Sequence, residues 1–280
     1  MGLVDNFLTE YKNLFLNEQN KIFVLVGPTA TGKTSFAVQL AKKIDAEIIN
    51  CDMAQIYSEV KIGTGQIKDV EKEGIEHYLF GFLTEPFSIS VYEMRQRIEA
   101  IIKLILLKNK KVLLVGGSSF CIYSLFFAPL ACVSKLMIAP FGRVASEVFY
   151  FSNEEKKDKD VIVFSPFFHY TVIFYDNYLV HKKLWLDGIK KRIDIFFLEG
   201  WLEEIRGLSD SWRSLLMQKK FIGYNELIPF VDFKNGFEMA EIKELIFFRT
   251  CQYGKKQRTF LRKMKRDFLL YEVSYKEWYF

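Results

Sequence analysis

Short apolar runs alternate with amphipathic segments along the first part of the chain. The runs Ile22–Val26, Glu47–Asn50 and Lys111–Val115 have the length and apolar content of buried strands. Between them, apolar residues recur at the spacing of helices that face a core, from Phe36 to Ile44 and from Val91 to Ile105. Strand, helix, strand, helix and strand in this order predict an α/β fold with a parallel sheet and right-handed crossovers.

The second part of the chain has a less regular pattern. Between residues 120 and 168, prolines and a charged stretch interrupt the apolar runs, which predicts a short irregular insertion. Another buried strand is expected at Tyr170–Tyr175, and helices are expected at about 180–206, 209–218 and 237–268.

These patterns divide the chain into three parts. Residues 1–119 are expected to form the first part of an α/β core, residues 120–168 the insertion, and residues 169–280 the rest of the core with a helical C-terminal region. The longest apolar run, Phe120–Val133, is too short to span a membrane and contains Pro129. We therefore expect no association with a membrane.

Composition supports a folded protein in a reducing compartment. Half of the 280 residues are apolar, which is enough for a large core. We therefore expect the chain to be folded and not disordered. The four cysteines show no C-x-x-C spacing, and no signal-peptide pattern precedes them. We therefore predict that the cysteines are free thiols and that the protein is cytoplasmic. The sequence does not specify the oligomeric state, and a monomer is the simplest expectation.

Charge is concentrated near the C-terminus. The net charge is +5, but the segment Arg249–Arg266 holds eight basic residues and no acidic one, so the remainder of the chain is at −3. Such asymmetry predicts a polyanionic partner, and an extended basic helix can follow a nucleic-acid backbone. The alternative is a solvated helix face.

The strongest motif follows the first predicted strand. Residues 27–34 read GPTATGKT and match the phosphate-binding loop pattern at every fixed position. In that pattern, backbone N–H groups and a helix N-terminus surround a phosphate, Lys33 adds a full charge, and the hydroxyl of Thr34 is suited to Mg²⁺. The phosphate- or nucleotide-binding residues predicted in this way are Gly27, Pro28, Thr29, Ala30, Thr31, Gly32, Lys33 and Thr34.

Polar side chains follow the next two strands of the predicted sheet. Asp52 comes after the second strand, and Ser118 and Ser119 come after the third. Because ligands bind at the carboxyl ends of parallel strands, these side chains are candidates for chemistry beside the phosphate loop. Considered alone, each of them is also a good helix N-cap.

Several stretches together resemble the tRNA dimethylallyltransferase family, and their order and spacing cover most of the chain outside residues 120–168. The stretches are GPTATGKT at 27–34, AEIINCDMAQIY at 46–57, KIGTG at 61–65, EHYLFGFLTEPFSIS at 76–90, KVLLVGGSS at 111–119, RID at 192–194, FIGYNEL at 221–227 and QYGKKQRTFLRK at 252–263. The resemblance implies a P-loop NTPase-like fold with a reduced insertion and a basic helical C-terminal part.

The resemblance also implies an activity. Members of this family transfer a prenyl group from dimethylallyl diphosphate to the exocyclic amine of an adenosine beside the tRNA anticodon, so the implied partners are tRNA and dimethylallyl diphosphate, with Mg²⁺ as cofactor. The phosphate loop would then hold a diphosphate leaving group. Consistent with this, the third strand ends in Gly116 and Gly117, without the acidic residue that a nucleoside triphosphatase usually places on its metal.

Specific roles follow by position. Asp52 matches the carboxylate that accepts a proton from the adenosine amine, and Ser118 lies where the family has a hydroxyl that contacts the target nucleotide. Gln55 is implied to contact the flipped base, and the basic segment the phosphates of the anticodon stem. The tRNA-binding residues implied by the resemblance are Asp52, Met53, Ala54, Gln55, Lys255, Lys256, Gln257 and Arg262.

The chain departs from the family pattern at several positions. Met53-Ala54 replaces a usual Ser-Met pair, and Lys182 and Gly188 stand where arginines are typical, so that Arg192 alone remains in that stretch. The insertion is also shorter than is usual in the family. These departures leave three hypotheses open: an active tRNA prenyltransferase, a non-catalytic tRNA-binding relative, and a prenyltransferase or kinase that acts on free adenine nucleotides.

Overall fold

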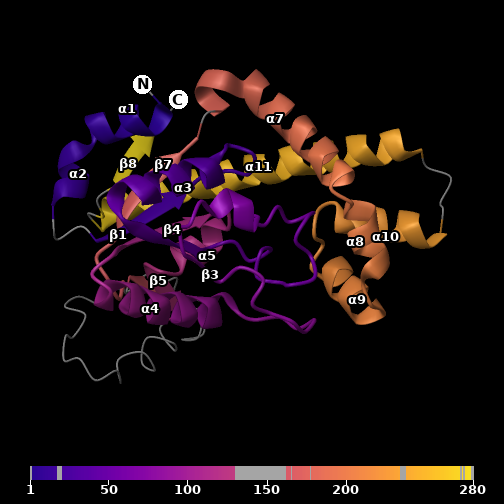
Figure 1. Cartoon of the computed structure of the whole chain (residues 1–280), viewed down its shortest axis with the longest axis horizontal. Helices are drawn as coiled ribbons and strands as arrows, with labels where there is room; N and C mark the ends of the chain where they lie inside the picture. Colours follow the sequence, from indigo (N-terminus) through magenta and orange to yellow (C-terminus); the bar gives the residue numbers. More distant parts are fainter. Residues whose placement is uncertain are drawn as a thin grey trace, which may run out of the picture.

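The computed structural model describes residues 2–17, 21–129, 162–164, 166–176, 178–233, 238–271, 273 and 275–278. Within these residues a parallel sheet of six strands forms the centre of the protein, in the order β3-β2-β4-β1-β7-β8 (Figure 1). The strands are β1 (Ile22–Val26), β2 (Ala46–Asn50), β3 (His77–Tyr78), β4 (Lys111–Gly116), β7 (Thr171–Tyr175) and β8 (Tyr275–Trp278). The parallel α/β fold expected from the apolar pattern is confirmed.

Helices cover both faces of the sheet, and the alternation of side chains along β1 shows how. Phe23 and Leu25 pack with α1 (Leu3–Glu10), α2 (Lys12–Leu16) and α3 (Lys33–Ile44). Val24 and Val26 belong to the core on the opposite face, with α4 (Val91–Leu107), α5 (Ser119–Tyr123) and α11 (Met239–Leu270). All five residues of β1 are buried, as expected for a central strand of a parallel sheet.

The remaining helices form a second region beside the carboxyl edge of the sheet. They are α7 (Tyr178–Leu198), α8 (Trp201–Gly207), α9 (Asp210–Gln218) and α10 (Tyr224–Phe233). The single helix predicted over 180–206 is in fact two, because Gly200 adopts φ 93° between α7 and α8. Helix α11 runs across the molecule and joins this region to the sheet (Figure 1).

Part of the predicted insertion belongs to the core. Residues 120–128 are buried with the exception of Phe120. They lie in α5, in the turn at 124–126 and in β5 (Phe127–Pro129), which pairs antiparallel with β6 (Ile162–Phe164). Residues 130–161 lie outside the described residues, so the proposed division into three parts stays a prediction. The chain also has a short 3₁₀ helix, η1 (Asp69–Lys72). In the described ranges, no helix combines the length and the apolar content needed to cross a membrane.

Candidate active site

The phosphate loop, residues 27–34, joins β1 to α3 as predicted. A Cβ at Gly27 would lie 1.9 Å from the carbonyl oxygen of Tyr175 in β7, and Gly32 has φ 81° just before α3 begins at Lys33. Both positions therefore require glycine. The N-terminus of α3 directs its free N–H groups and its partial positive charge at the hollow of the loop, where an anion is stabilised.

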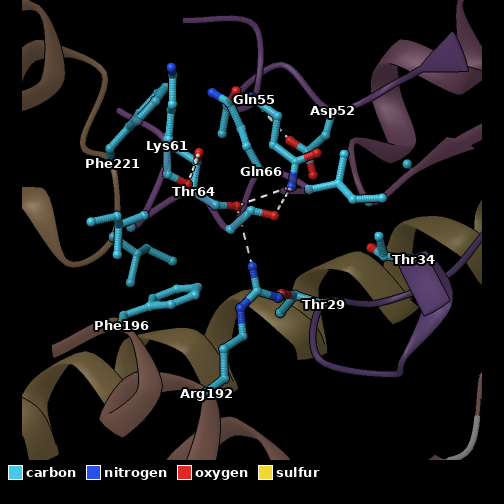
Figure 2. A pocket seen from close by; sticks show the side chains of 18 of the residues that line it. Thr29, Thr34, Asp52, Gln55, Lys61, Thr64, Gln66, Arg192, Phe196 and Phe221 are labelled. Carbon is cyan, nitrogen blue, oxygen red and sulfur yellow. Dashed lines mark hydrogen bonds between the residues drawn. The ribbon is translucent and has the colours of Figure 1, made fainter. Parts of the chain in front are cut away.

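Lys33 and Thr34 occupy different environments at the start of α3. The ammonium of Lys33 is buried, contacts the Pro28 carbonyl oxygen and lies 3.4 Å from the Thr31 hydroxyl. Burial lowers the pKa of Lys33 to about 7, and the charge of Asp52 acts in the opposite direction. An anion in the loop would favour the charged ammonium. Thr34 is exposed and lines the adjoining pocket (Figure 2).

Side chains from two helices bind the backbone of the phosphate loop. The Thr29 N–H donates to Gln257 Oε1 at 2.9 Å, while Gln257 Nε2 donates to the Gly117 carbonyl oxygen at 2.7 Å. The Trp185 indole N–H donates to the Thr29 carbonyl oxygen at 2.9 Å. The loop is thus fixed by α11 on one side and by α7 on the other.

This geometry corrects the prediction for Gln257. Its side chain is 4% exposed, and both ends of its amide bind backbone groups of the two loops at the strand ends. A buried, fully engaged amide cannot reach an RNA phosphate. Gln257 is therefore a positioning residue for the phosphate loop, and the tRNA contact predicted for it is wrong.

Arg192 was not among the predicted site residues, although the sequence singled it out as the arginine that remains in its stretch. Its guanidinium donates to the Thr29 hydroxyl at 3.2 Å and to the Thr64 carbonyl oxygen at 3.3 Å, and it lies 5.0 Å from the centre of the Phe196 ring. Figure 2 shows it reaching from α7 into the space between these two loops. Burial lowers the pKa of Arg192, and Asp52 opposes that shift. A second cation thus lies beside the phosphate loop.

Asp52 and Ser118 meet at the carboxyl ends of β2 and β4. The Ser118 hydroxyl lies 3.5 Å from Asp52 Oδ1 and accepts from the Met53 N–H at 3.2 Å, and Asp52 Oδ1 accepts from the Ala54 N–H at 3.1 Å. Residues 52–55 form a turn, so Asp52 caps no helix. Ser118 stands at the N-cap position of α5, but its hydroxyl makes no capping hydrogen bond. The capping alternatives are therefore not what these side chains do.

Gln55 supports the loop at residues 61–65. Its amide nitrogen donates to the carbonyl oxygens of Thr64 at 3.1 Å and Gly65 at 2.9 Å, the former contact being drawn in Figure 2. The Gln55 side chain thus fixes the position of this loop, whose Thr64 carbonyl oxygen also accepts from Arg192. Met53 and Ala54 line the same pocket. Contact between any of these residues and a base stays a prediction.

A single pocket of about 680 Å³ brings these groups together. One end is formed by the phosphate loop, with Thr34 and Asp52 on that side (Figure 2). Toward the helical region the walls carry seven apolar or aromatic side chains beside several charged ones. The apolar or aromatic side chains are Ile189, Ile193, Phe196, Phe221, Ile222, Ile246 and Tyr253. The pocket can therefore take a ligand with a phosphorylated end and an apolar or aromatic body.

The donor set near the loop fits a hard divalent cation. Among the described residues, no group of three or more His, Cys, Asp or Glu side chains converges on one point. Magnesium, however, usually takes one or two protein oxygens and completes its shell with water and substrate phosphates. The Thr34 hydroxyl and the Asp52 carboxylate line the pocket and are oxygen ligands of that kind.

The exposed basic residues of α11 share one face. Six of the eight in Arg249–Arg266 are exposed, and five of these form no salt bridge with the described residues and lie within an arc of about 120° at 100° per residue. They are Lys255, Lys256, Arg262, Lys263 and Arg266, and we call them the basic stripe. The stripe includes three of the predicted tRNA-binding residues.

The other three basic residues of this segment are engaged within the protein. Arg249 pairs with Glu226, Lys265 pairs with Glu277, and Arg258 pairs with Asp176 through two contacts at 2.9 and 3.1 Å. The Arg258 guanidinium also lies against Tyr178 and Trp185, at 3.9 and 4.2 Å from the ring centres. Because these charges are already paired, the positive surface is smaller and more directional than the sequence suggested.

The sheet, the loop and the pocket define a P-loop α/β protein with a pocket suited to a phosphorylated, partly apolar ligand. Two family models match the chain: isopentenyl transferase over residues 20–159 and IPP transferase over residues 143–264. A tRNA dimethylallyltransferase of Phytoplasma australiense is 30% identical over 272 residues, covering 86% of this chain and 89% of the relative. The chain belongs to the tRNA dimethylallyltransferase family.

Further relatives and solved structures agree. A tRNA dimethylallyltransferase of Enterococcus faecalis is 30% identical over 282 residues, covering 86% of this chain and 88% of the relative. The tRNA isopentenylpyrophosphate transferase of Bacillus halodurans superposes with a TM-score of 0.65 at 21% identity, covering 92% of this chain and 89% of that one. A eukaryotic dimethylallyltransferase solved acting on tRNA gives 0.66 at 19% identity, covering 92% and 74%. The family resemblance and the P-loop NTPase-like fold are thereby confirmed.

Proposed function

We propose that this protein transfers a dimethylallyl group from dimethylallyl diphosphate to the N6 amine of an adenosine adjacent to the anticodon of a tRNA. The observation that carries the proposal is the single pocket in which a phosphate loop with two cations, Lys33 and Arg192, faces the carboxylate of Asp52 across a space with apolar walls. The diphosphate binds in the loop, C1 of the prenyl group meets the adenosine amine beside Asp52, and the apolar side chains of the pocket contact the prenyl chain. A cytoplasmic location and a monomeric state belong to the same proposal.

The groups present account for each bond change. The amine nitrogen attacks C1 of the dimethylallyl group while the C–O bond breaks, and the electron pair of that bond leaves with the diphosphate. Lys33, Arg192 and the N–H groups of the loop stabilise the charge that develops on the leaving oxygen. The amine proton passes to Asp52, which offsets the poor nucleophilicity of a nitrogen conjugated with the ring. Ser118 holds the carboxylate in position through its hydroxyl.

A magnesium ion would be held by Thr34 and by diphosphate oxygens. It would supply Lewis-acid stabilisation of the leaving group. Lys33 and Arg192 also stabilise the leaving group, by their charge and their hydrogen-bond donors, because both lie beside the loop that holds the phosphates.

A direct assay tests the proposal. Unmodified tRNA is incubated with the protein, dimethylallyl diphosphate and Mg²⁺, and the digested nucleosides are separated by mass spectrometry, with AMP and ATP offered as competing acceptors. We expect a prenylated adenosine from tRNA and none from the free nucleotides. Salt-dependent binding of tRNA without product, under conditions in which a control enzyme of the family is active, would instead identify a non-catalytic relative.

The basic stripe gives a second expected result. Replacing Lys255, Lys256 and Arg262 together by Gln should weaken tRNA binding and reduce the slope of log affinity against log salt by roughly two to three, because each lost phosphate contact removes about 0.7–0.9. The turnover number at saturating tRNA should stay within about twofold. Fluorescence anisotropy with a labelled anticodon stem-loop measures the slope.

A remote-lysine control accompanies that variant. It replaces Lys12, Lys21 and Lys103 by Gln, three exposed lysines that line no part of the pocket and lie outside the stripe. It removes the same charge, so it reports the effect of net charge alone. Equal slopes for the two variants would show that the stripe makes no specific contact with the RNA.

A further inference from the structure

The end of the pocket away from Thr34 is built around one tryptophan. Trp201, at the start of α8, is 1% exposed and lies between two glycines that are far apart in the chain. A Cβ at Gly63 would lie 2.0 Å from its indole nitrogen, and a Cβ at Gly223 would lie 2.0 Å from its ring. Two loops are therefore pressed against opposite parts of one side chain.

Partly buried hydrogen bonds join the same two loops. The Tyr224 hydroxyl accepts from the Gly63 N–H at 3.0 Å and donates to Glu204 Oε1 at 2.5 Å, while Glu204 Oε2 accepts from the Ile62 N–H at 2.7 Å. Burial raises the pKa of Tyr224, and the neighbouring Glu204 acts in the same direction, so the phenol stays protonated as a donor. The relative position of the loops is fixed before any substrate binds.

Three lysines stand on these fixed loops and line the mouth of the pocket: Lys61, two residues before Gly63, and Lys219 and Lys220, just before Gly223. We call them the lysine rim. Within the described ranges their ammonium groups form no hydrogen bond or salt bridge, and Lys61 interacts electrostatically with Asp69. Lys219 is partly buried, which lowers the pKa of its ammonium. Figure 2 shows Lys61 beside Phe221, at the end of the pocket away from Thr34.

The acidic side chains around the rim are already engaged. Glu199 pairs with Lys68, Glu71 accepts from the Lys68 N–H at 2.9 Å, and Asp69 pairs with Lys72 at 2.6 Å. Glu204 is occupied by the loop hydrogen bonds described above. Asp69 interacts electrostatically with Lys61 but forms its salt bridge with Lys72, so the rim keeps a net positive charge that can act on an external anion.

The backbone of Lys220 has an unfavourable conformation. It follows α9 with φ 52°, a left-handed conformation that a helix C-terminus usually assigns to glycine or asparagine. A lysine in this position is less stable than glycine, because its Cβ is crowded by the following carbonyl oxygen. Lysines near a helix C-terminus also interact favourably with its carbonyl groups, so a capping role is the competing explanation.

We propose that the lysine rim binds backbone phosphates of the RNA strand on either side of the nucleotide that enters the pocket. The inference rests on the proposed function, since it assigns the strand that carries the acceptor adenosine to this end of the pocket. Flipping a nucleotide draws its two flanking phosphates toward the mouth of the site. Three ammonium groups carried by these fixed loops around that mouth offset the repulsion between those phosphates. The pocket then has two phosphate sites, the loop for the diphosphate and the rim for RNA.

The test compares a rim variant with the remote-lysine control. The rim variant carries Lys61→Gln, Lys219→Gln and Lys220→Asn, because asparagine tolerates the left-handed backbone at 220. We expect its KM for an anticodon stem-loop to rise about tenfold or more and its salt slope to fall by roughly two, as for three single-strand phosphate contacts. Its KM for dimethylallyl diphosphate and its turnover number should stay within about twofold.

Other outcomes overturn the inference. A higher KM for dimethylallyl diphosphate with unchanged stem-loop affinity would assign the rim to the entry of the diphosphate. A lower melting temperature with unchanged stem-loop affinity would assign the lysines to capping of α9. Stem-loop binding is also measured without the prenyl donor. If the wild type gives no product, the proposed function fails, while the difference in binding between the two variants still decides the role of the rim.

Discussion

Replacing Asp52 by Asn should lower the turnover number by roughly 10²–10⁴-fold, the range for loss of a general base. The amide has the shape of the carboxylate and can still accept from the Ala54 N–H, so the turn at 52–55 is kept. It cannot take the amine proton. Single-turnover transfer to a tRNA stem-loop measures the loss, and the affinity for the stem-loop should change by less than about threefold.

A matched control separates this effect from a general loss of charge. Asp69→Asn removes the same charge from an almost fully exposed side chain on η1, which pairs only with Lys72 among the described contacts. Its activity should equal that of the wild type. If Asp52→Asn kept more than about a tenth of the wild-type rate, Asp52 would not be the proton acceptor.

Replacing Lys33 by Ala should lower kcat/KM for dimethylallyl diphosphate by roughly 10²–10³-fold, as for the loss of one preorganised donor to a developing negative charge. The affinity for tRNA should be unchanged. Lys42→Ala is the matched control on the same helix, because that lysine is exposed and pairs with Glu73. Equal effects of the two substitutions would contradict a role for Lys33 at the leaving group.

The buried position of Lys33 also predicts a pH dependence. Its pKa is lowered to about 7 in the folded protein, so above that pH the free site must take up a proton to present a charged ammonium. The affinity for inorganic diphosphate should therefore fall as the pH rises from 7 to 9, and fall less with Lys33→Ala. Titration calorimetry measures both affinities. The protonation of diphosphate itself changes equally for the two proteins, so the difference between them reports the protonation of Lys33.

The same group affects stability. Between pH 7 and about 10 the unfolded chain holds the proton that folded Lys33 has lost, so this group makes the free energy of unfolding rise with pH.

Much of the α/β core could be predicted because its signals are local. The apolar runs of β1, β2 and β4, and the glycines around the phosphate loop, specify their own conformation within a few residues. The last strand, Tyr275–Trp278, was missed, because its short sequence has two charged or polar positions in four and only its parallel pairing with β7 makes it a strand. The break at Gly200 was missed because apolar periodicity continues on both sides of it.

The candidate site was predictable to the extent that strand order places residues at one edge. Asp52, Ser118 and the phosphate loop were expected to meet, and they line one pocket. The role of Gln257 was predicted wrongly, because a run of charges does not reveal which turns of a helix are buried. Arg192 could have been found from its RID stretch, but nothing in the sequence indicated that it reaches both Thr29 and Thr64.

By itself, the sequence determined a parallel α/β core, a phosphate site between β1 and α3, and an uneven positive charge near the C-terminus. These properties depend on periodicity, on glycine and on composition, which act over a few residues. Only the tertiary structure decided which charges serve substrates and which serve the fold. It buried Arg258 against Asp176, kept the basic stripe exposed, and fixed the lysine rim through Trp201. These assignments depend on contacts between residues far apart in the chain, and packing alone sets such contacts.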